Sequence, residues 1–432
     1  MKKIRGYTIS LGCPKNLVDT EKFLGKIKDY YIPCDNPEHA DVIIINTCAF
    51  IKEAVEEAID TILQTTVSLK NKQKPPYVIV TGCLVERYKK ELEKEIPEVD
   101  CFVQIKDQDK IPQIIKERFS LDCHISSLQR LFSTPASYGY LKIAEGCDHK
   151  CSFCIIPNLR GRFRSYPEDQ LVKEAQSILD SGRKELIVVA QDVTSYGIDI
   201  GAQHRFFSLL KKLVHLKGLF WLRLLYLYPQ GVTEDLLKFL KDISPPFIPY
   251  FDIPFQHSHP DILKRMGRPF KTNGLKLIEK IKKYFPDAVF RTSIIVGFPG
   301  EEEKHFCNLI EFVKKARFHH MGVFEYSNEE ESRAYRFSNQ VPDHIKRERK
   351  EILMEIQKEI SREYLKDFVD KELTLLVDKK SDEWPTLYEA RAWFQAPEVD
   401  GKTYVSAQDI KPGDVIKAEV IEAYNYDLSA IL

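Results

Sequence analysis

The sequence from residue 145 to residue 154 reads Glu145-Gly146-Cys147-Asp148-His149-Lys150-Cys151-Ser152-Phe153-Cys154. Its three cysteines fall within eight residues, close enough to wrap one cuboidal iron–sulfur cluster. Four thiolates would close a 4Fe-4S cluster, whereas three leave one iron without a protein ligand. An iron with a free position can chelate a substrate, as an open zinc site does. We therefore expect a 4Fe-4S cluster on Cys147, Cys151 and Cys154.

The alternative for these cysteines is a single zinc ion. Zinc sites usually pair two knuckles of two ligands each, and the sequence has no second knuckle here. His149 could supply a fourth ligand only if its ring folded back inside its own loop. The cluster is the better interpretation.

Strands and helices alternate on the carboxyl side of a connector at 132–139. Six apolar runs typical of strands occupy residues 140–144, 186–191, 221–227, 250–253, 289–296 and 321–326. Amphipathic segments typical of helices occupy residues 167–179, 234–240, 273–284 and 302–316. Six strand–helix units predict a partial (β/α)6 barrel, and the cysteine motif follows its first strand, at the edge where barrel chemistry takes place.

The residues before the connector show the same alternation. Apolar runs at 5–11, 42–46, 77–81 and 101–103, with a helical pattern at 53–63, predict a parallel sheet covered by helices. Cys13, Cys48 and Cys83 each follow the end of one run, and the carboxyl ends of parallel strands share an edge where ligands collect. We expect a second three-cysteine cluster there, again with one open iron. The alternative is three loop thiols that follow strands by chance.

The last part of the chain has a different pattern. A helical stretch at 342–368 precedes short β-like runs at 373–377, 388–393, 403–405 and 415–424, which Gly401 and the Pro412-Gly413 turn interrupt. This pattern predicts a small all-β domain. The expected α/β fold thus has three domains: 1–125 with the sheet and one cluster, 133–368 with the barrel and the long helix, and 369–432.

Composition limits the cellular setting. The 64 basic and 64 acidic residues cancel, so no overall charge indicates a nucleic-acid or membrane-surface protein. Apolar runs are far shorter than the ~20 residues of a membrane helix, and no secretory signal is visible, so we expect a cytoplasmic protein. In that reducing compartment clustered cysteines indicate metal binding rather than disulfides. We assign no role to Cys34, Cys101, Cys123 and Cys307.

The motif at 145–154, with an aromatic residue before its last cysteine, resembles that of the radical S-adenosylmethionine (SAM) superfamily. The resemblance implies that the open iron binds the amino and carboxyl groups of SAM. Electron transfer into the sulfonium then yields a 5′-deoxyadenosyl radical that removes a hydrogen. It also implies that residues near the motif and at the barrel strand ends contact SAM, namely Phe153, Gln191, Gln256, Ser293 and Gly297.

The whole chain resembles the methylthiotransferase family, whose small C-terminal β domain is called TRAM. The stretches 10–19, 141–147 and 394–401 resemble the branch that modifies a ribosomal protein. The resemblance implies that an aspartate of the small-subunit ribosomal protein conventionally numbered twelve exchanges a β-carbon hydrogen for a methylthio group. One SAM would methylate sulfur at the cluster on Cys13, Cys48 and Cys83, and another would supply the radical. The sequence identifies neither the sulfur donor nor the electron donor.

Two other functions remain open at this point. One is the same chemistry on a tRNA adenosine, and the other is a non-catalytic, cluster-bearing module that binds RNA or the ribosome. Residues 370–432 contain seven Lys/Arg and thirteen Asp/Glu, a net charge of −6. Such a domain repels a phosphate backbone and attracts a basic ribosomal protein, which makes RNA binding the weaker expectation. An acidic surface that merely aids solubility is the alternative.

Overall fold

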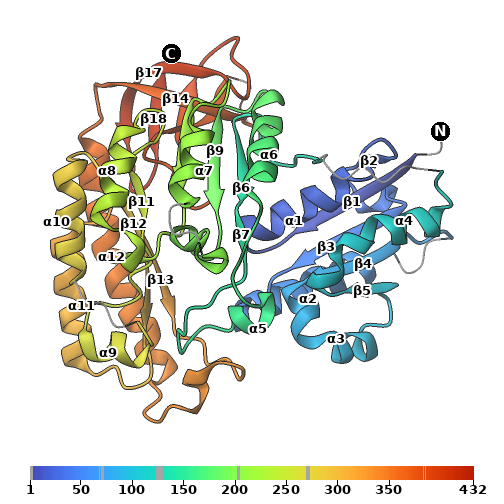
Figure 1. Cartoon of the computed structure of the whole chain (residues 1–432), viewed down its shortest axis with the longest axis horizontal. Coiled ribbons are helices and arrows are strands. Elements are labelled where there is room, and N and C mark those ends of the chain that lie inside the picture. Colours follow the sequence, from blue (N-terminus) through green and yellow to red (C-terminus); the bar gives the residue numbers. More distant parts are fainter. Residues whose placement is uncertain are drawn as a thin grey trace. The chain divides into compact units, whose positions relative to one another are not determined.

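The computed structural model describes residues 3–67, 69, 73–122, 130–201, 205–268, 273–382, 384 and 386–432 (Figure 1). Cys123, one of the cysteines without an assigned role, lies outside these residues. The chain forms two compact units. One contains Met1–Ser133 and Ile155–Arg162, and the other contains Thr134–Cys154 and Phe163–Leu432. The short segment after Cys154 therefore packs with the N-terminal residues.

The N-terminal unit contains a five-stranded parallel sheet of order β2-β1-β3-β4-β5. Its strands are β1 Ile4–Ser10, β2 Tyr31–Pro33, β3 Val42–Thr47, β4 Tyr77–Gly82 and β5 Cys101–Val103. Its helices are α1 Pro14–Gly25, α2 Lys52–Val67, α3 Cys83–Glu95, α4 Ile111–Phe119 and α5 Ile156–Arg160. The predicted helix-covered parallel sheet is confirmed, and the three-residue edge strand β2 is the strand that the sequence analysis missed.

Strand β3 shows why both faces of this sheet are covered. Ile43 and Ile45 pack into a core with α2, α3 and α5, whereas Val42 and Ile44 pack into a second core with α1 and α4. Successive side chains point to opposite faces of a strand, so a continuous apolar run needs helices on both sides.

The second unit begins with six parallel strands in the orders β10-β9-β6 and β11-β12-β13. A parallel bridge between Leu222 and Phe247 joins the two groups. The strands are β6 Tyr138–Lys142, β9 Glu185–Val189, β10 Trp221–Leu224, β11 Tyr250–Asp252, β12 Val289–Val296 and β13 His320–Glu325. The predicted partial barrel is confirmed.

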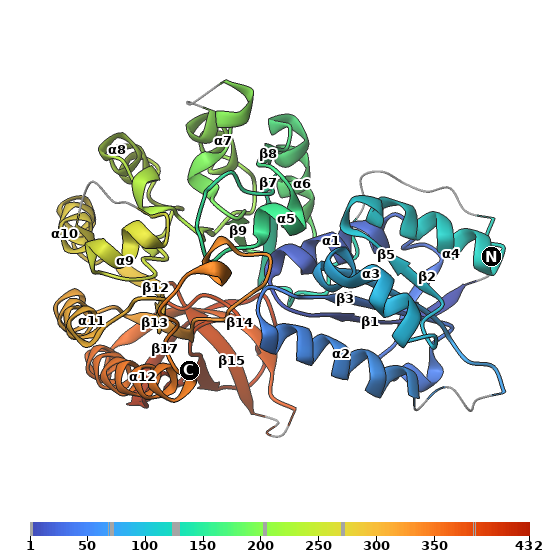
Figure 2. The ribbon, with the colours of Figure 1, turned by 90° about the horizontal axis from the view of Figure 1, so that it is seen from below.

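Figure 2 shows the helices of this unit in an arc outside the barrel strands. They are α6 Glu168–Asp180, α7 Arg205–Leu213, α8 Glu234–Asp242, α9 Pro260–Arg265, α10 Gly274–Tyr284, α11 Glu303–Ala316 and α12 Asp343–Lys366. A short hairpin pairs β7 Ala144–Glu145 with β8 Arg164–Ser165. None of the helices in the described part of the chain combines the length and apolarity that a membrane span requires.

The tail forms a closed barrel of order β14-β15-β16-β18-β17. Its strands are β14 Glu372–Lys380, β15 Leu387–Ala392, β16 Thr403–Ser406, β17 Val415–Ala423 and β18 Leu428–Ile431. The predicted small β domain is confirmed. The sequence analysis missed β18 because only Leu428 and Ala430 point inward from this four-residue strand.

A buried charge network joins the tail to the (β/α)6 barrel. Glu185 is fully buried and accepts hydrogen bonds from Arg223 Nε at 2.6 Å and Arg391 Nη1 at 2.7 Å. Arg391 Nε also donates to Asp378 at 2.6 Å. Burial acts to raise the pKa of Glu185, but the two guanidinium groups outweigh it and lower that pKa. Arg223, inside strand β10, therefore has a buried carboxylate partner, which gives it a structural role.

Glu185→Ala should strongly destabilise this unit, because Arg223 would lose its carboxylate partner in the core. Breaking a buried pair from one side costs about 3–5 kcal/mol, which should lower the urea midpoint followed by circular dichroism. Lys417→Ala is the control, since its 2.8 Å pair with Glu372 is exposed, and it should leave the midpoint unchanged. Equal midpoint shifts in both variants would contradict this account.

Candidate functional site

Cys13, Cys48 and Cys83 converge at one edge of the N-terminal sheet. Cys13 is the N-cap of α1 after β1, Cys48 follows β3, and Cys83 is the first residue of α3 after β4. The three strands are neighbours and parallel, so their carboxyl ends lie side by side. The thiols are close enough to influence one another's ionisation. The expected convergence is thus present in the structure.

Asn16 ties two of the cysteine loops together. Its Nδ2 donates to Leu11 O at 2.9 Å, before Cys13, and to Thr47 O at 3.0 Å, before Cys48. Its Oδ1 accepts a hydrogen bond from Arg160, and its side chain is fully buried. Sequence reasoning did not identify Asn16 or Arg160. The available signal in the sequence was an asparagine, Asn16, three residues after the predicted ligand Cys13.

Gly12 allows the loops of Cys13 and Cys48 to approach closely. Its φ is +86°, and a Cβ at this position would lie 2.6 Å from Cys48 Cβ and 2.9 Å from Cys48 Sγ. Any side chain there would displace Cys48. The close approach shapes a compact cradle around the thiols.

The thiols lie in an environment that suits a bound metal group. Burial raises the pKa of Cys83 to about 12, and burial together with the neighbouring Cys13 raises the pKa of Cys48. Burial also acts to raise the pKa of Cys13, but Lys15 and Arg160 outweigh it and lower that pKa. Metal binding requires thiolates, and a bound cation supplies the charge that stabilises them. The donor set therefore fits an iron–sulfur cluster.

The loop of Cys147, Cys151 and Cys154 lies between β7 and α5. Ser152 anchors it, because its N donates to Met266 O at 2.9 Å and its Oγ donates to Arg265 O at 2.8 Å. Arg268 Nη1 lies 3.7 Å from Cys151 Sγ. The loop is thus bound to the residues that end α9, and a cation faces one of its thiols.

His149 has contacts of its own. Its Nε2 lies 2.7 Å from Asp192 Oδ2, and its ring stacks on Tyr228 at 3.8 Å between centroids. Burial acts to raise the pKa of Asp192, but hydrogen bonds from His149, Ser195 and Thr194 outweigh it and lower that pKa. The ring nitrogen Nε2 is engaged by a carboxylate, which favours a three-cysteine donor set.

Two of the expected SAM contacts, Gln191 and Gln256, lie at the carboxyl edge of the barrel. Gln191, just after β9, has a buried amide whose oxygen and nitrogen have no protein partner. Gln256 has φ +69°, and its N donates to Ser293 O at 2.8 Å. An orphaned buried amide is expected to meet a ligand or water. Their contact with SAM stays a prediction.

Two further expected contacts, Phe153 and Gly297, have structural neighbours. Phe153 packs against the apolar cluster that contains Met266 and Phe298. Gly297 has φ +71°, and a Cβ there would lie 2.2 Å from Cγ of Lys346 on α12. The absence of a side chain at Gly297 is therefore required by the packing of α12, and its contact with SAM stays a prediction as well.

His259, Asp261 and His305 form a trio whose ligand atoms lie within 4.8 Å of one another, although the sequence showed no such grouping. His259 Nδ1 accepts from Asp261 N at 3.3 Å, and His305 Nδ1 accepts from Glu302 N at 2.9 Å. A metal-bound histidine usually donates a hydrogen bond from its second nitrogen. These histidines instead cap α9 and α11 and fit a metal poorly.

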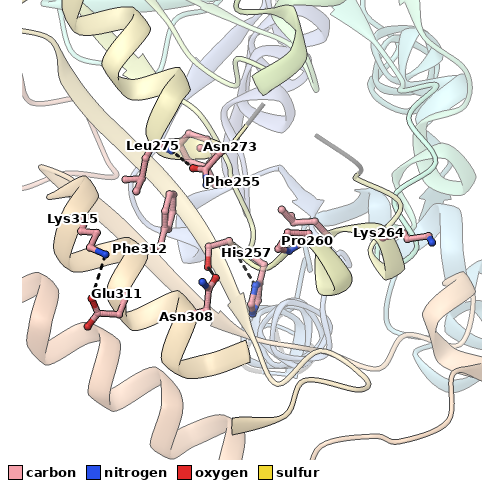
Figure 3. A pocket seen from close by; sticks show the side chains of 13 residues that line it. Phe255, His257, Pro260, Lys264, Asn273, Leu275, Asn308, Glu311, Phe312 and Lys315 are labelled. Atoms are coloured by element: carbon pink, nitrogen blue, oxygen red, sulfur yellow. Dashed lines mark hydrogen bonds and ion pairs between the residues drawn. The ribbon is translucent and has the colours of Figure 1, made fainter. Parts of the chain in front are cut away.

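A pocket of about 820 Å³ is lined in part by Pro260, which lies between His259 and Asp261 in the sequence (Figure 3). Phe312 and Lys315 on α11 and Leu275 on α10 contribute to its walls. Its lining contains none of the six clustered cysteines and none of the five expected SAM contacts. We therefore place the candidate chemistry at the strand edges and not in this pocket.

The fold and the two donor sets define a radical SAM enzyme with two iron–sulfur clusters. Residues 5–104 match the Uncharacterized protein family UPF0004, residues 141–313 match the Radical SAM superfamily, and residues 369–432 match the TRAM domain. Among solved structures, the radical SAM methyltransferase TsrM from Kitasatospora setae has a TM-score of 0.54 at 11% identity, over 75% of this chain and 73% of that chain. That likeness concerns the fold alone.

Close relatives cover nearly the whole chain. The ribosomal protein uS12 methylthiotransferase RimO of Lawsonia intracellularis is 48% identical over 99% of this chain and 98% of that protein. Its namesake in Aquifex aeolicus is 46% identical over 98% of this chain and 95% of that protein. The chain belongs to the RimO family of methylthiotransferases, and its cofactors are SAM and two 4Fe-4S clusters.

Gly12→Ala should prevent loading of the cluster predicted on Cys13, Cys48 and Cys83, because the new methyl group would displace Cys48. Iron and acid-labile sulfide per chain, measured after anaerobic reconstitution, should fall by about half. Gly182→Ala is the control. Gly182 also has a positive φ, +95°, but a Cβ there meets nothing within 4 Å. Full loading of the Gly12→Ala variant would contradict the close-packing argument.

Proposed function

We propose that this chain replaces a β-carbon hydrogen of an aspartate in ribosomal protein uS12 with a methylthio group. The observation that carries this proposal is the pair of three-cysteine groups, each at the carboxyl edge of its own set of parallel strands. Relatives named ribosomal protein uS12 methylthiotransferase are 48% identical over 99% of the chain. A carbon without a leaving group cannot be attacked directly, so its hydrogen must be removed first.

The two groups of three cysteines have different roles in this proposal. Cys147, Cys151 and Cys154 would hold the cluster that binds SAM, and Cys13, Cys48 and Cys83 would hold the cluster that presents sulfur for methylation by a second SAM. When bound, the first of these clusters would supply the electron for reductive cleavage of SAM, and the adenosyl fragment would take the substrate hydrogen and leave as 5′-deoxyadenosine. No side-chain base is needed, because a hydrogen atom and not a proton is removed.

In this scheme, the barrel residues near Cys147, Cys151 and Cys154 orient SAM. Gln191 offers a buried amide without a protein partner, which suits the polar groups of a nucleoside or amino acid. Ser293 and Gln256 shape the adjoining strand ends through their backbone hydrogen bond. Arg268, 3.7 Å from Cys151 Sγ, offsets negative charge at the thiolates.

The acidic tail is the proposed docking surface for the basic substrate protein. Asp378, Glu398, Asp400 and Arg391 contact the barrel. Ten acidic and six basic residues of the tail remain, a net charge of −4. This charge attracts a basic protein and speeds its encounter, whereas it repels RNA phosphates. We place the reaction in the cytoplasm, a reducing compartment that keeps the thiols free for clusters.

Cysteine substitutions should separate the two half-reactions. Cys151→Ala should abolish 5′-deoxyadenosine formation, because SAM cleavage needs the cluster on Cys147, Cys151 and Cys154. Cys48→Ala should retain 5′-deoxyadenosine formation and lose methylthio transfer. Both products would be measured by mass spectrometry with SAM, dithionite and sulfide under anaerobic conditions. Equal 5′-deoxyadenosine yields from wild type and Cys151→Ala would refute the assignment of the radical cluster.

The same assay tests the substrate. Purified uS12 and adenosine-modified tRNA would be offered separately, and a mass gain of one methylthio group should appear on uS12 alone. A gain on tRNA alone would refute the proposed substrate and keep the chemistry. The absence of 5′-deoxyadenosine under every condition would favour a non-catalytic module.

Charge reversal on the tail should weaken docking. Glu419 and Glu422 are exposed on β17, and replacing both with lysine should raise KM for uS12 several-fold with little change in kcat. The raised KM should also lose its dependence on salt, since screened attraction is what has been removed. The same double change at the exposed Glu279 and Glu311, on α10 and α11, is the control. Equal effects at both places would argue against docking on the tail.

A further inference from the structure

A buried arginine lies beside the thiols of Cys13, Cys48 and Cys83. Arg160, the last residue of α5, is 7% exposed. Its guanidinium binds Asn16, whose side chain bonds the loops of Cys13 and Cys48, and its charge acts on all three thiols. Its helix is fixed in place, because Ile155 and Leu159 share an apolar core with Cys83.

Two polar side chains of α1 hold the guanidinium in position. One of its nitrogens, Nη2, donates to Asn16 Oδ1, and Nη1 lies 3.3 Å from Asp19 Oδ2. Asn16 is the residue that ties the loops of Cys13 and Cys48. The planar fork of an arginine can bind these groups on one side and present another N–H to a thiol, which a lysine cannot reproduce.

The charge of Arg160 acts on any group that the three thiols hold. Three thiolates around a cluster core give a net negative assembly, and reduction adds one electron and no proton. A nearby cation stabilises the more negative state, and it does so more strongly in a buried site than in water. An anionic sulfur ligand on the open iron would add charge of the same sign, which this cation also offsets.

We propose that Arg160 is a positioning residue that raises the reduction potential of the cluster on Cys13, Cys48 and Cys83. The inference rests on the proposed function, because it requires these cysteines to hold a cluster. Lys15, which also lies near Cys13, remains in every variant below. Differences between the variants therefore report on Arg160.

The test uses the full chain with Cys147, Cys151 and Cys154 all changed to alanine, so that one cluster remains. Anaerobically reconstituted protein would be titrated with dithionite and followed by electron paramagnetic resonance. In Arg160→Met, the ratio of reduced to oxidised cluster at a fixed solution potential should fall about tenfold, which corresponds to about 59 mV for one electron. Arg162→Met removes the same charge from an exposed position on the same segment and should leave the ratio unchanged.

An unchanged ratio in Arg160→Met would overturn the proposal, as would an equal fall in Arg162→Met. If Arg160→Met takes up no cluster, Arg160→Lys decides. A loaded Arg160→Lys protein with a ratio near that of the parent supports the role of charge, and failure to load would assign Arg160 to folding alone. If the parent with three alanines takes up no iron, the proposed assignment of a cluster to Cys13, Cys48 and Cys83 is wrong, and this outcome does not depend on Arg160.

Discussion

Parallel strand pairing is the constraint on which the second cysteine group depends. In the register of the sheet, Ser10 pairs with Asn46 and Asn46 pairs with Thr81, so β1, β3 and β4 end at the same level. Cys13 follows this level by three residues, and Cys48 and Cys83 follow it by two. Residues spaced 35 apart along the chain therefore meet without any local motif. A different strand order would scatter them although every side chain stayed the same.

Buried hydrogen bonds turn this convergence into a defined site. Asn46 Nδ2 donates to Asn16 O at 2.9 Å, and Thr47 Oγ1 donates to Thr81 O at 2.6 Å. Each bond connects neighbouring strand ends or their loops. A buried polar group without a partner is costly, whereas a satisfied network specifies one arrangement. The loops are thus fixed by their own polar contacts, and the thiols are held near one another by the protein.

The sequence predicted those features that depend on neighbouring residues. The six barrel strands have apolar runs such as Leu186–Val189, and the motif at 145–154 has local cysteine spacing. The convergence of Cys13, Cys48 and Cys83 was also predicted, because each follows the end of a strand. Side-chain contacts between distant residues were missed. Arg160 and Asn16 are 144 residues apart and meet only in the folded N-terminal unit. Strand β2 was missed although the equally short edge strand β5 was predicted, because β2 ends in a proline, Pro33, and buries only Tyr31.

The sequence also does not show which charged residues have a buried partner. The sequence places Arg223 in a strand, where it could serve a pocket or a partner, and only the structure shows Glu185 beside it. The net charge of the tail likewise overstates what a substrate meets. Asp400 accepts a hydrogen bond from Tyr250 at 2.6 Å, and Asp378 accepts one from Ser137 at 2.6 Å.

These carboxylates attach the tail to the barrel and are not offered to a partner. Under the proposed docking, the attraction for a basic protein would come from exposed acids such as Glu419 and Glu422. Because exposed charges are screened over about 10 Å at moderate salt, they act mainly on the rate of encounter. Any preference for one substrate sequence must come from residues that contact the aspartate and its neighbours. The acidic residues of the tail thus fall into two groups. One group binds the barrel, and the other faces solvent and forms the proposed docking surface.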